Sequence, residues 1–123
     1  MIGSAATYRG FAGQIAARAR AATFVADYRL APEHPFLAAF EDAGRALAGL
    51  QSAGYATVAM VGDSAGGGLA LAALASGRVS HAVAAALFSL YIDLSHSGES
   101  MTSRADVDHI LPPPRCSRRP INI

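Results

Sequence analysis

One segment, residues 58–71, restricts the folds open to this chain more than any other. An apolar run with β-branched residues enters Gly-Asp-Ser-Ala-Gly-Gly at 62–67, and the chain continues as an Ala- and Leu-rich stretch. This order is typical of a serine nucleophile held on a strained turn between a strand and a helix. We therefore expect the helix to direct its N-terminus, with its partial positive charge, toward the hydroxyl of Ser64.

The glycines around Ser64 suit a tight turn from strand to helix. Gly62 and Gly66 lie two residues on either side of it, where we expect a Cβ to collide as the chain doubles back. A simpler alternative is a glycine-rich turn in which the Ser64 side chain caps the helix, because serine is a favoured N-cap residue. The strand pattern before the turn and the helix pattern after it favour the nucleophile turn.

The rest of the chain alternates helical and extended patterns. Helices are predicted at 8–22, 37–52 and 65–76, and strands at 23–28, 57–62 and 82–92. This alternation predicts an α/β fold with three parallel strands joined by right-handed crossovers. Because the last strand is continuously apolar, we expect both of its faces to be covered. We place one domain at 1–111 and predict an unrelated, irregular Pro/Arg tail at 112–123.

Composition excludes several classes of protein. Hydrophobic residues make up 52% of the chain and charged residues 15%, which is unlike a disordered protein. Cys116 is the single cysteine, so intrachain disulfides and cysteine-rich metal sites are excluded, and we expect no metal or other cofactor. The longest apolar stretches, of about eleven residues, are too short for a membrane span. The N-terminus lacks a signal-peptide pattern, which favours a cytoplasmic protein.

The basic residues are all arginines, and three of them, Arg115, Arg118 and Arg119, lie in the predicted tail. A basic tail of this kind can bind nucleic acid. The chain has no basic stripe interleaved with aromatic residues and no phosphate-binding Gly-rich loop ending in Lys-Ser or Lys-Thr. We therefore predict no nucleic-acid partner.

Three segments resemble the hormone-sensitive-lipase branch of the α/β-hydrolase esterases: Asp-Tyr-Arg-Leu-Ala-Pro-Glu-His-Pro-Phe at 27–36, followed by Ala-Phe-Glu-Asp at 39–42; Gly-Asp-Ser-Ala-Gly-Gly at 62–67; and Leu-Tyr-Ile-Asp-Leu at 90–94. The resemblance implies a partial α/β-hydrolase fold and hydrolysis of small-molecule carboxylic esters through an acyl-enzyme. It implies that Ser64 is the nucleophile and that the backbone N–H of Ala65 is an oxyanion donor. Gly62, Gly66 and Gly67 would shape the turn.

The resemblance also implies parts that this chain does not contain. In the family, a His-Gly-Gly oxyanion loop precedes a segment like Ile-Gly-Ser at 2–4, and the triad acid and His follow the serine at greater distances than Ile123 allows. We therefore expect truncation at both ends, with neither triad acid nor triad His present. Loss of the strand that belongs between 23–28 and 57–62 would leave unpaired edges, through which the chain could self-associate. The alternative to an active esterase is thus an inactive truncated product, or a non-catalytic assembly or binding partner.

None of the four histidines is expected to replace the missing base. His34 belongs to the Pro-Glu-His-Pro segment, where it is structural. His81 precedes the last strand, at the end opposite Ser64, and is predicted to be a surface residue. His96 and His109 follow that strand on the correct edge but lack an evident orienting acid.

Three acidic residues were candidates for the missing acid, and each has a structural interpretation. Asp63 is expected to point away from Ser64 because of the geometry of the turn. Asp93 ends the last predicted strand on the side of Ser64, at the position of a family Asp that is not the triad acid. Glu33 is expected to hydrogen-bond loop backbone.

Overall fold

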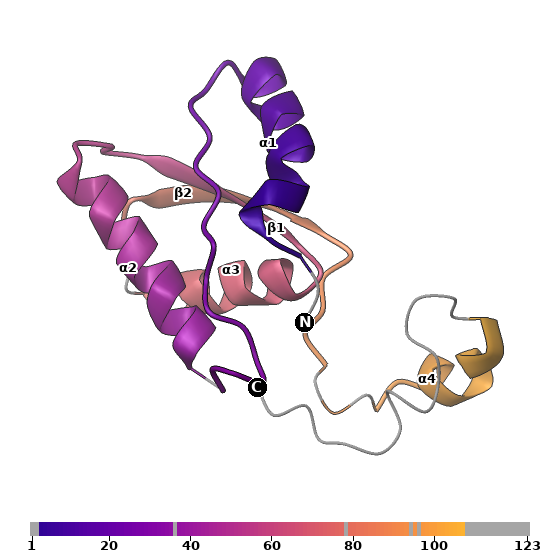
Figure 1. Cartoon of the computed structure of the whole chain (residues 1–123). Coiled ribbons are helices and arrows are strands. Elements are labelled where there is room, and N and C mark those ends of the chain that lie inside the picture. The colour runs from indigo at the N-terminus through magenta and orange to yellow at the C-terminus, as the bar shows by residue number, and fades with distance from the viewer. Residues whose placement is uncertain (1–2, 36, 78, 94, 96, 108–123) are drawn as a thin grey trace.

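The structure is a computed structural model that describes residues 3–35, 37–77, 79–93, 95 and 97–107. Its elements follow one another along the chain (Figure 1) in the order α1 (Ala5–Ala19), α2 (Ala38–Ser52), β1 (Val58–Asp63), α3 (Ala65–Ala75), β2 (Ala82–Phe88), α4 (Ser100–Ser103) and a 3₁₀ helix (Ala105–Val107). Among these described helices, none is long and apolar enough to cross a membrane. The predicted tail at 112–123 lies outside the described residues.

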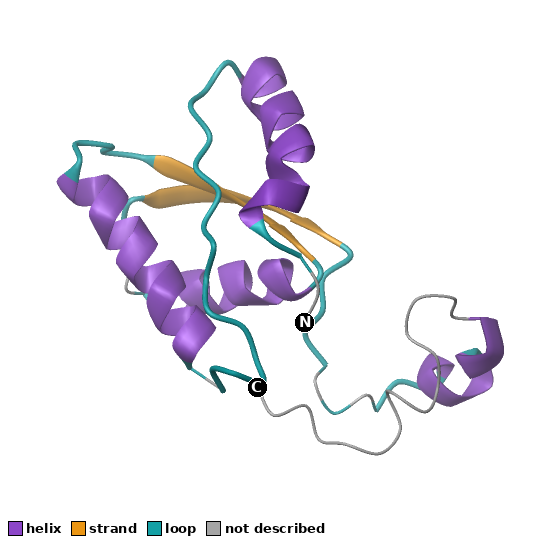
Figure 2. Ribbon diagram, viewed as in Figure 1, coloured by secondary structure: helices purple, strands orange, loops and turns teal. Residues whose placement is uncertain are grey.

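The sheet of the described residues consists of β1 and β2, which pair in parallel with α3 as the crossover between them. Residues 59–63 lie opposite residues 84–88. Figure 2 shows α1 on one side of this sheet and α2 and α3 on the other. The predicted α/β class is therefore confirmed, and the parallel pairing brings the carboxyl ends of both strands to the edge where Ser64 lies.

The core lies where α2 and α3 pack beneath the start of the sheet. Leu47 of α2 is 7% exposed, and Ala73 of α3 and Val79 are similarly buried. Burying a side chain the size of Leu or Val contributes about 1.5–3 kcal/mol. Five partly buried residues pack against this cluster: Phe40, Val58, Met60, Leu74 and Ala82.

Local signals set the ends of the helices. α1 begins earlier than predicted because the Ser4 side chain accepts a hydrogen bond from the N–H of Thr7 while the Thr7 side chain accepts one from the N–H of Ser4. Gly54, with φ +94°, follows the end of α2, and Gly77, with φ +67°, follows the end of α3. These are conformations that glycine adopts without strain, so both predicted helix ends are confirmed.

The prediction of a strand at 23–28 is wrong. The chain there runs without regular structure, and among the described residues the sheet contains only β1 and β2. β-branched and aromatic residues favour a strand only when a neighbouring strand completes the hydrogen-bonded ladder. Phe24 is 62% exposed, and side-chain bonds hold the segment instead: Asp27 Oδ1 accepts the N–H of Ala5 at 2.9 Å.

The expectation for the last strand also needs correction. β2 ends at Phe88 rather than at residue 92, because Ser89 turns the chain with φ 45°. The prediction that both of its faces are covered is wrong, since Val83 is 67% exposed and most of the strand is accessible. An apolar strand is buried on both faces only where other elements cover them. The described helices leave most of β2 open.

An ion pair fastens the 27–36 segment to α2. Arg29 Nε and Nη2 bind Asp42 Oδ2 and Oδ1 at 2.8 and 2.9 Å, and the backbone N–H of Arg29 donates to Oδ2 at 3.0 Å. Arg45 adds a contact to Asp42 at 3.0 Å. The Arg29 hydrogen bonds hold the pKa of the Asp42 carboxyl well below its usual range. The two halves of the 27–42 motif are thus one structural unit.

Candidate active site at Ser64

Ser64 lies on the turn between β1 and α3, with φ 54° and ψ −117°. A non-glycine residue at positive φ is strained and persists only where its surroundings hold it. Ser64 is the N-cap of α3, yet its exposed side chain makes no capping hydrogen bond. The alternative of a turn whose Ser64 side chain caps the helix is therefore not what the structure contains.

Backbone hydrogen bonds fix the conformation of Ser64 on both sides. Its N–H donates to the carbonyl of Phe88, at the end of β2, over 2.9 Å. Its carbonyl accepts the N–H groups of Gly67, Gly68 and Tyr91 at 3.1–3.2 Å. The turn is therefore tied to α3, to the end of β2 and to the loop that follows β2.

Close approach of neighbouring atoms explains three of the four glycines at 62 and 66–68. A Cβ on Gly62 would lie 2.5 Å from the carbonyl oxygen of Gly66, and one on Gly68 would lie 2.4 Å from that of Tyr91. A Cβ on Gly67 would come within 3.0 Å of the Leu90 side chain. At Gly66 the expected collision is absent, because the nearest atom is the Tyr28 hydroxyl at 3.6 Å.

The start of α3 offers hydrogen-bond donors beside the Ser64 hydroxyl. The N–H groups of Gly67 and Gly68 are used by the Ser64 carbonyl. Those of Ala65 and Gly66 precede the first bond of the helix, and such groups have no intrahelical acceptor. The first turn of α3 contains no acidic residue that would offset its partial positive charge. A developing oxyanion at Ser64 would meet this end of the helix.

The acidic residues near Ser64 have partners of their own. Asp63 Oδ2 accepts the Tyr8 hydroxyl at 2.6 Å, so its carboxylate is engaged by α1, and this hydrogen bond raises the pKa of Tyr8. The Asp93 carboxylate accepts bonds from the backbone N–H and hydroxyl groups of Ser95 and Ser97, which hold its pKa well below its usual range. Both carboxylates therefore stabilise loops and turns.

One of the two described histidines, His81, lies in different surroundings from those expected. His81 is 7% exposed, and its Nε2 lies 3.1 Å from the carbonyl oxygen of Leu47, so its prediction as a surface residue is wrong. It does lie at the end of the sheet opposite Ser64. His34 is exposed, and its backbone N–H donates to Leu30. His96 and His109 lie outside the described residues.

Glu33 makes no side-chain hydrogen bond to another described residue, although a bond to loop backbone was expected.

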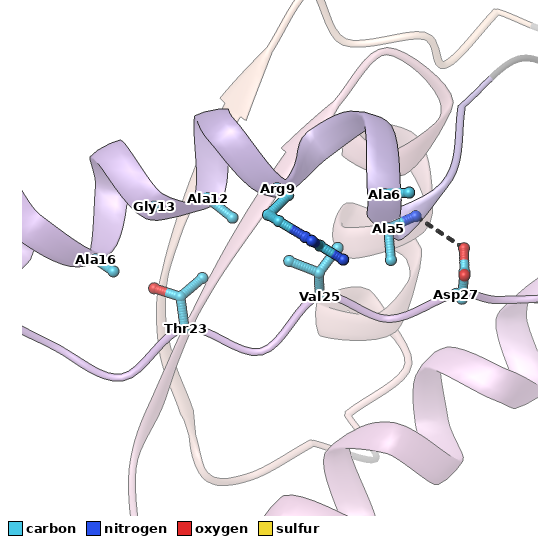
Figure 3. Close-up of a pocket in the computed structure, with 9 residues that line it drawn as sticks. All are labelled: Ala5, Ala6, Arg9, Ala12, Gly13, Ala16, Thr23, Val25 and Asp27. Carbon is cyan, nitrogen blue, oxygen red and sulfur yellow. Dashed lines mark hydrogen bonds between the residues drawn. The ribbon is translucent and has the colours of Figure 1, made fainter.

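A hollow of about 450 Å³ lies between α1 and residues 23–27 (Figure 3). Its lining is mostly small and apolar, with Arg9 and Asp27 as the charged groups. Ser64 does not line it, so this hollow is no acyl pocket beside the serine.

A sequence model described as the alpha/beta hydrolase fold matches residues 1–117. The chain belongs to the α/β-hydrolase-fold family. An acetyl-hydrolase of Streptomyces hygroscopicus is 39% identical over 108 residues, covering 84% of this chain and 36% of that relative. The esterase LipI of Mycobacterium tuberculosis is 41% identical over 76 residues, covering 57% of this chain and 24% of that relative.

Solved structures of α/β-hydrolase esterases match the same fold. EstE5 superposes with a TM-score of 0.83 at 38% identity, covering 94% of this chain and 41% of EstE5. A hormone-sensitive lipase from a metagenome library gives a TM-score of 0.79 at 35% identity, covering 95% and 42%. The resemblance carried by the three segments is confirmed. The chain spans about two-fifths of the length of these hydrolases.

Two residues that contact the turn, Tyr8 and Tyr91, were not predicted from the sequence as parts of the site. Tyr8 is 55 positions from Asp63 in the sequence. Tyr91 follows β2 in the chain, and its N–H donates a hydrogen bond to the Ser64 carbonyl. No local spacing pairs residues that are so distant along the chain. Tyr8 belongs to no motif, and Tyr91 lies within the Leu-Tyr-Ile-Asp-Leu segment without a contact assigned to it by the resemblance.

Proposed function

We propose that Ser64 is the nucleophile of a carboxylic ester hydrolase of the esterase/lipase type. The observation that carries this proposal is the strained, exposed Ser64 at the start of α3, with the N–H of Ala65 left without an intrahelical acceptor. Strain is retained at a residue when a function or the surrounding structure requires it. The similarity to an acetyl-hydrolase and to esterases supports the same reaction class.

In the proposed reaction, Ser64 Oγ attacks the carbonyl carbon of an ester and forms a tetrahedral oxyanion. The N–H of Ala65 donates to that oxyanion, and donors of this kind are worth about 3–4 kcal/mol. The C–O bond to the alcohol then breaks, leaving Ser64 acylated, and water releases the acid. The proton of Ser64 passes to a base and from there to the departing alkoxide. No described histidine contacts Ser64, so the described residues do not supply that base.

The substrates we propose are small-molecule carboxylic esters. One solved structure of the related EstE5 comes from a crystal soaked in p-nitrophenyl butyrate, and another is of EstE5–PMSF. These two compounds are suitable probes, because the first is an activated ester and the second sulfonylates nucleophilic serines.

Labelling of Ser64 tests the proposal directly. The full chain is incubated with PMSF or a fluorophosphonate, and the modified residue is located by mass spectrometry of a digest. We expect label on Ser64, none in Ser64→Ala, and unchanged label in Ser52→Ala, which removes an exposed hydroxyl elsewhere. A folded chain that takes up no label would contradict the nucleophile. Hydrolysis of p-nitrophenyl butyrate then separates a chain that only acylates from one that turns over.

The second candidate function is that of a non-catalytic assembly or binding partner. It is favoured by the open strand edges, since β1 and β2 each pair on one side only within the described sheet, and Val83 is 67% exposed. Size-exclusion chromatography with light scattering tests it. A concentration-independent monomer would contradict self-association through these edges.

A further inference from the structure

Helix α1 reaches the Ser64 turn with two aromatic side chains from one of its faces. Tyr8 and Phe11 are three residues apart, so their side chains are neighbours on the helix surface. Their rings lie edge to face, with centroids 6.3 Å apart. The Tyr8 hydroxyl donates to Asp63 at 2.6 Å, and the Phe11 ring lies edge to face against Phe88 at 5.8 Å.

Each of these contacts involves a residue that is joined directly to the backbone of Ser64, by a peptide bond or by a hydrogen bond. Asp63 directly precedes it, and the Phe88 carbonyl accepts its N–H at 2.9 Å. α1 therefore contacts the residue before the strained position and the residue that holds its amide. A residue at positive φ persists only where neighbouring groups keep it there. The two contacts place such groups, the Tyr8 hydroxyl and the Phe11 ring, against the neighbours of Ser64.

The part of α1 that carries Tyr8 is itself fixed. Ser4 and Thr7 form a reciprocal cap at the first turn, and Asp27 accepts the N–H of Ala5. Tyr8 thus donates from an anchored turn rather than from a frayed helix end. Its pKa is raised, chiefly by the hydrogen bond to Asp63, so the hydroxyl keeps its proton and remains a donor at neutral pH.

We propose that Tyr8 is a positioning residue for Ser64, acting through Asp63 to hold the turn in the conformation that exposes the Ser64 hydroxyl. Its effect on reactivity rests on the proposed function, while its effect on the turn does not. Tyr8 touches neither Ser64 nor a substrate in this role. It acts by limiting how often the turn opens.

Amide hydrogen exchange measures that opening without requiring activity. In Tyr8→Phe we expect the Ser64 N–H to exchange at least about tenfold faster, as the loss of one hydrogen bond to a carboxylate predicts. The N–H of Ala73, buried in α3, should keep its wild-type rate. Tyr55→Phe is the matched control, because Tyr55 is 50% exposed and its hydroxyl makes no hydrogen bond to a described residue.

A double-mutant cycle connects the effect to Asp63. In an Asp63→Ala background, the Tyr8→Phe change should cause no further acceleration at Ser64. An unchanged Ser64 rate in Tyr8→Phe would overturn the proposal. Equal acceleration at Ser64 and Ala73 would overturn it as well, because that result denotes general destabilisation.

The rate of fluorophosphonate labelling provides the functional readout. Tyr8→Phe should slow the labelling of Ser64, because a turn that is held less tightly positions the hydroxyl less precisely for attack, and Tyr55→Phe should not. A wild-type rate of labelling in Tyr8→Phe would overturn the link between turn and reactivity. If the wild-type chain takes no label, the proposed function fails, and the exchange data still decide the role of Tyr8.

Discussion

Replacing Ser64 by glycine is expected to raise the free energy of unfolding while removing the proposed nucleophile. At φ 54° and ψ −117°, a residue with a Cβ is strained by about 1–3 kcal/mol, and glycine adopts this conformation without that cost. The greater freedom of glycine in the unfolded chain opposes the gain by about 0.5–1 kcal/mol. The net stabilisation we expect is about 1 kcal/mol.

Ser64→Ala is the matched control for this prediction. It removes the same hydroxyl but keeps the Cβ, so the backbone strain remains. Because the Ser64 side chain is exposed and makes no capping hydrogen bond, its loss should change the free energy of unfolding by less than about 0.5 kcal/mol. Comparing the two variants separates backbone strain from any contribution of the side chain.

Urea denaturation followed by far-ultraviolet circular dichroism measures the difference. With an m-value of about 1–3 kcal/mol per molar urea, the Ser64→Gly midpoint should lie about 0.3–1 M above that of Ser64→Ala. A Ser64→Gly midpoint equal to or below that of Ser64→Ala would refute the reasoning, because Ser64 would then hold no strain that glycine relieves. Both variants should fail to take up the fluorophosphonate.

Three further predictions concern packing and charge. A Cβ at position 62 requires the backbone at Gly66 to move by about 0.9 Å, so Gly62→Ala should lower the free energy of unfolding by about 3 kcal/mol in urea melts. Gly49→Ala is the control, because Gly49 has open space around it in α2, and it should raise the free energy of unfolding by about 0.5–1 kcal/mol. Leu47→Ala should cost about 2–4 kcal/mol through the cavity it leaves, and a smaller loss in the same melts would show that the site collapses. The pKa of Asp42 is lowered, so its contribution to the free energy of unfolding is present above the ordinary pKa of 3.8 and is lost as the pH falls through the lowered pKa. Asp42→Asn should flatten this dependence of stability on acid pH. An unchanged pH profile in Asp42→Asn would contradict the prediction.

The parts of the fold that the sequence predicts well are those set by neighbouring residues. The strand, the turn at Ser64 and the helix after it are contiguous, so their order is readable from one segment. The ends of α2 and α3 depend on Gly54 and Gly77, whose backbone freedom is a local property. The family resemblance also depends on contiguous motifs.

Several of the failures concern partners that are distant along the chain. Residues 23–28 have strand-forming side chains, but a strand also needs a neighbour, and none of the described strands pairs with them. His81 is buried because the Leu47 carbonyl lies beside its ring, and that proximity follows from the packing of α2. The contact between Tyr8 and Asp63 depends in the same way on how α1 packs against the sheet.

The loop after β2 is bonded to the carbonyl of Ser64 through the N–H of Tyr91, and the Tyr91 carbonyl lies closely against Gly68. This loop therefore adjoins Ser64, the proposed nucleophile, through main-chain atoms. In a directed-evolution library, insertions or deletions at 89–93 would shift the serine itself, while side-chain changes that keep the loop backbone would leave it in place. The length of this loop is thus a constraint on the position of the proposed nucleophile.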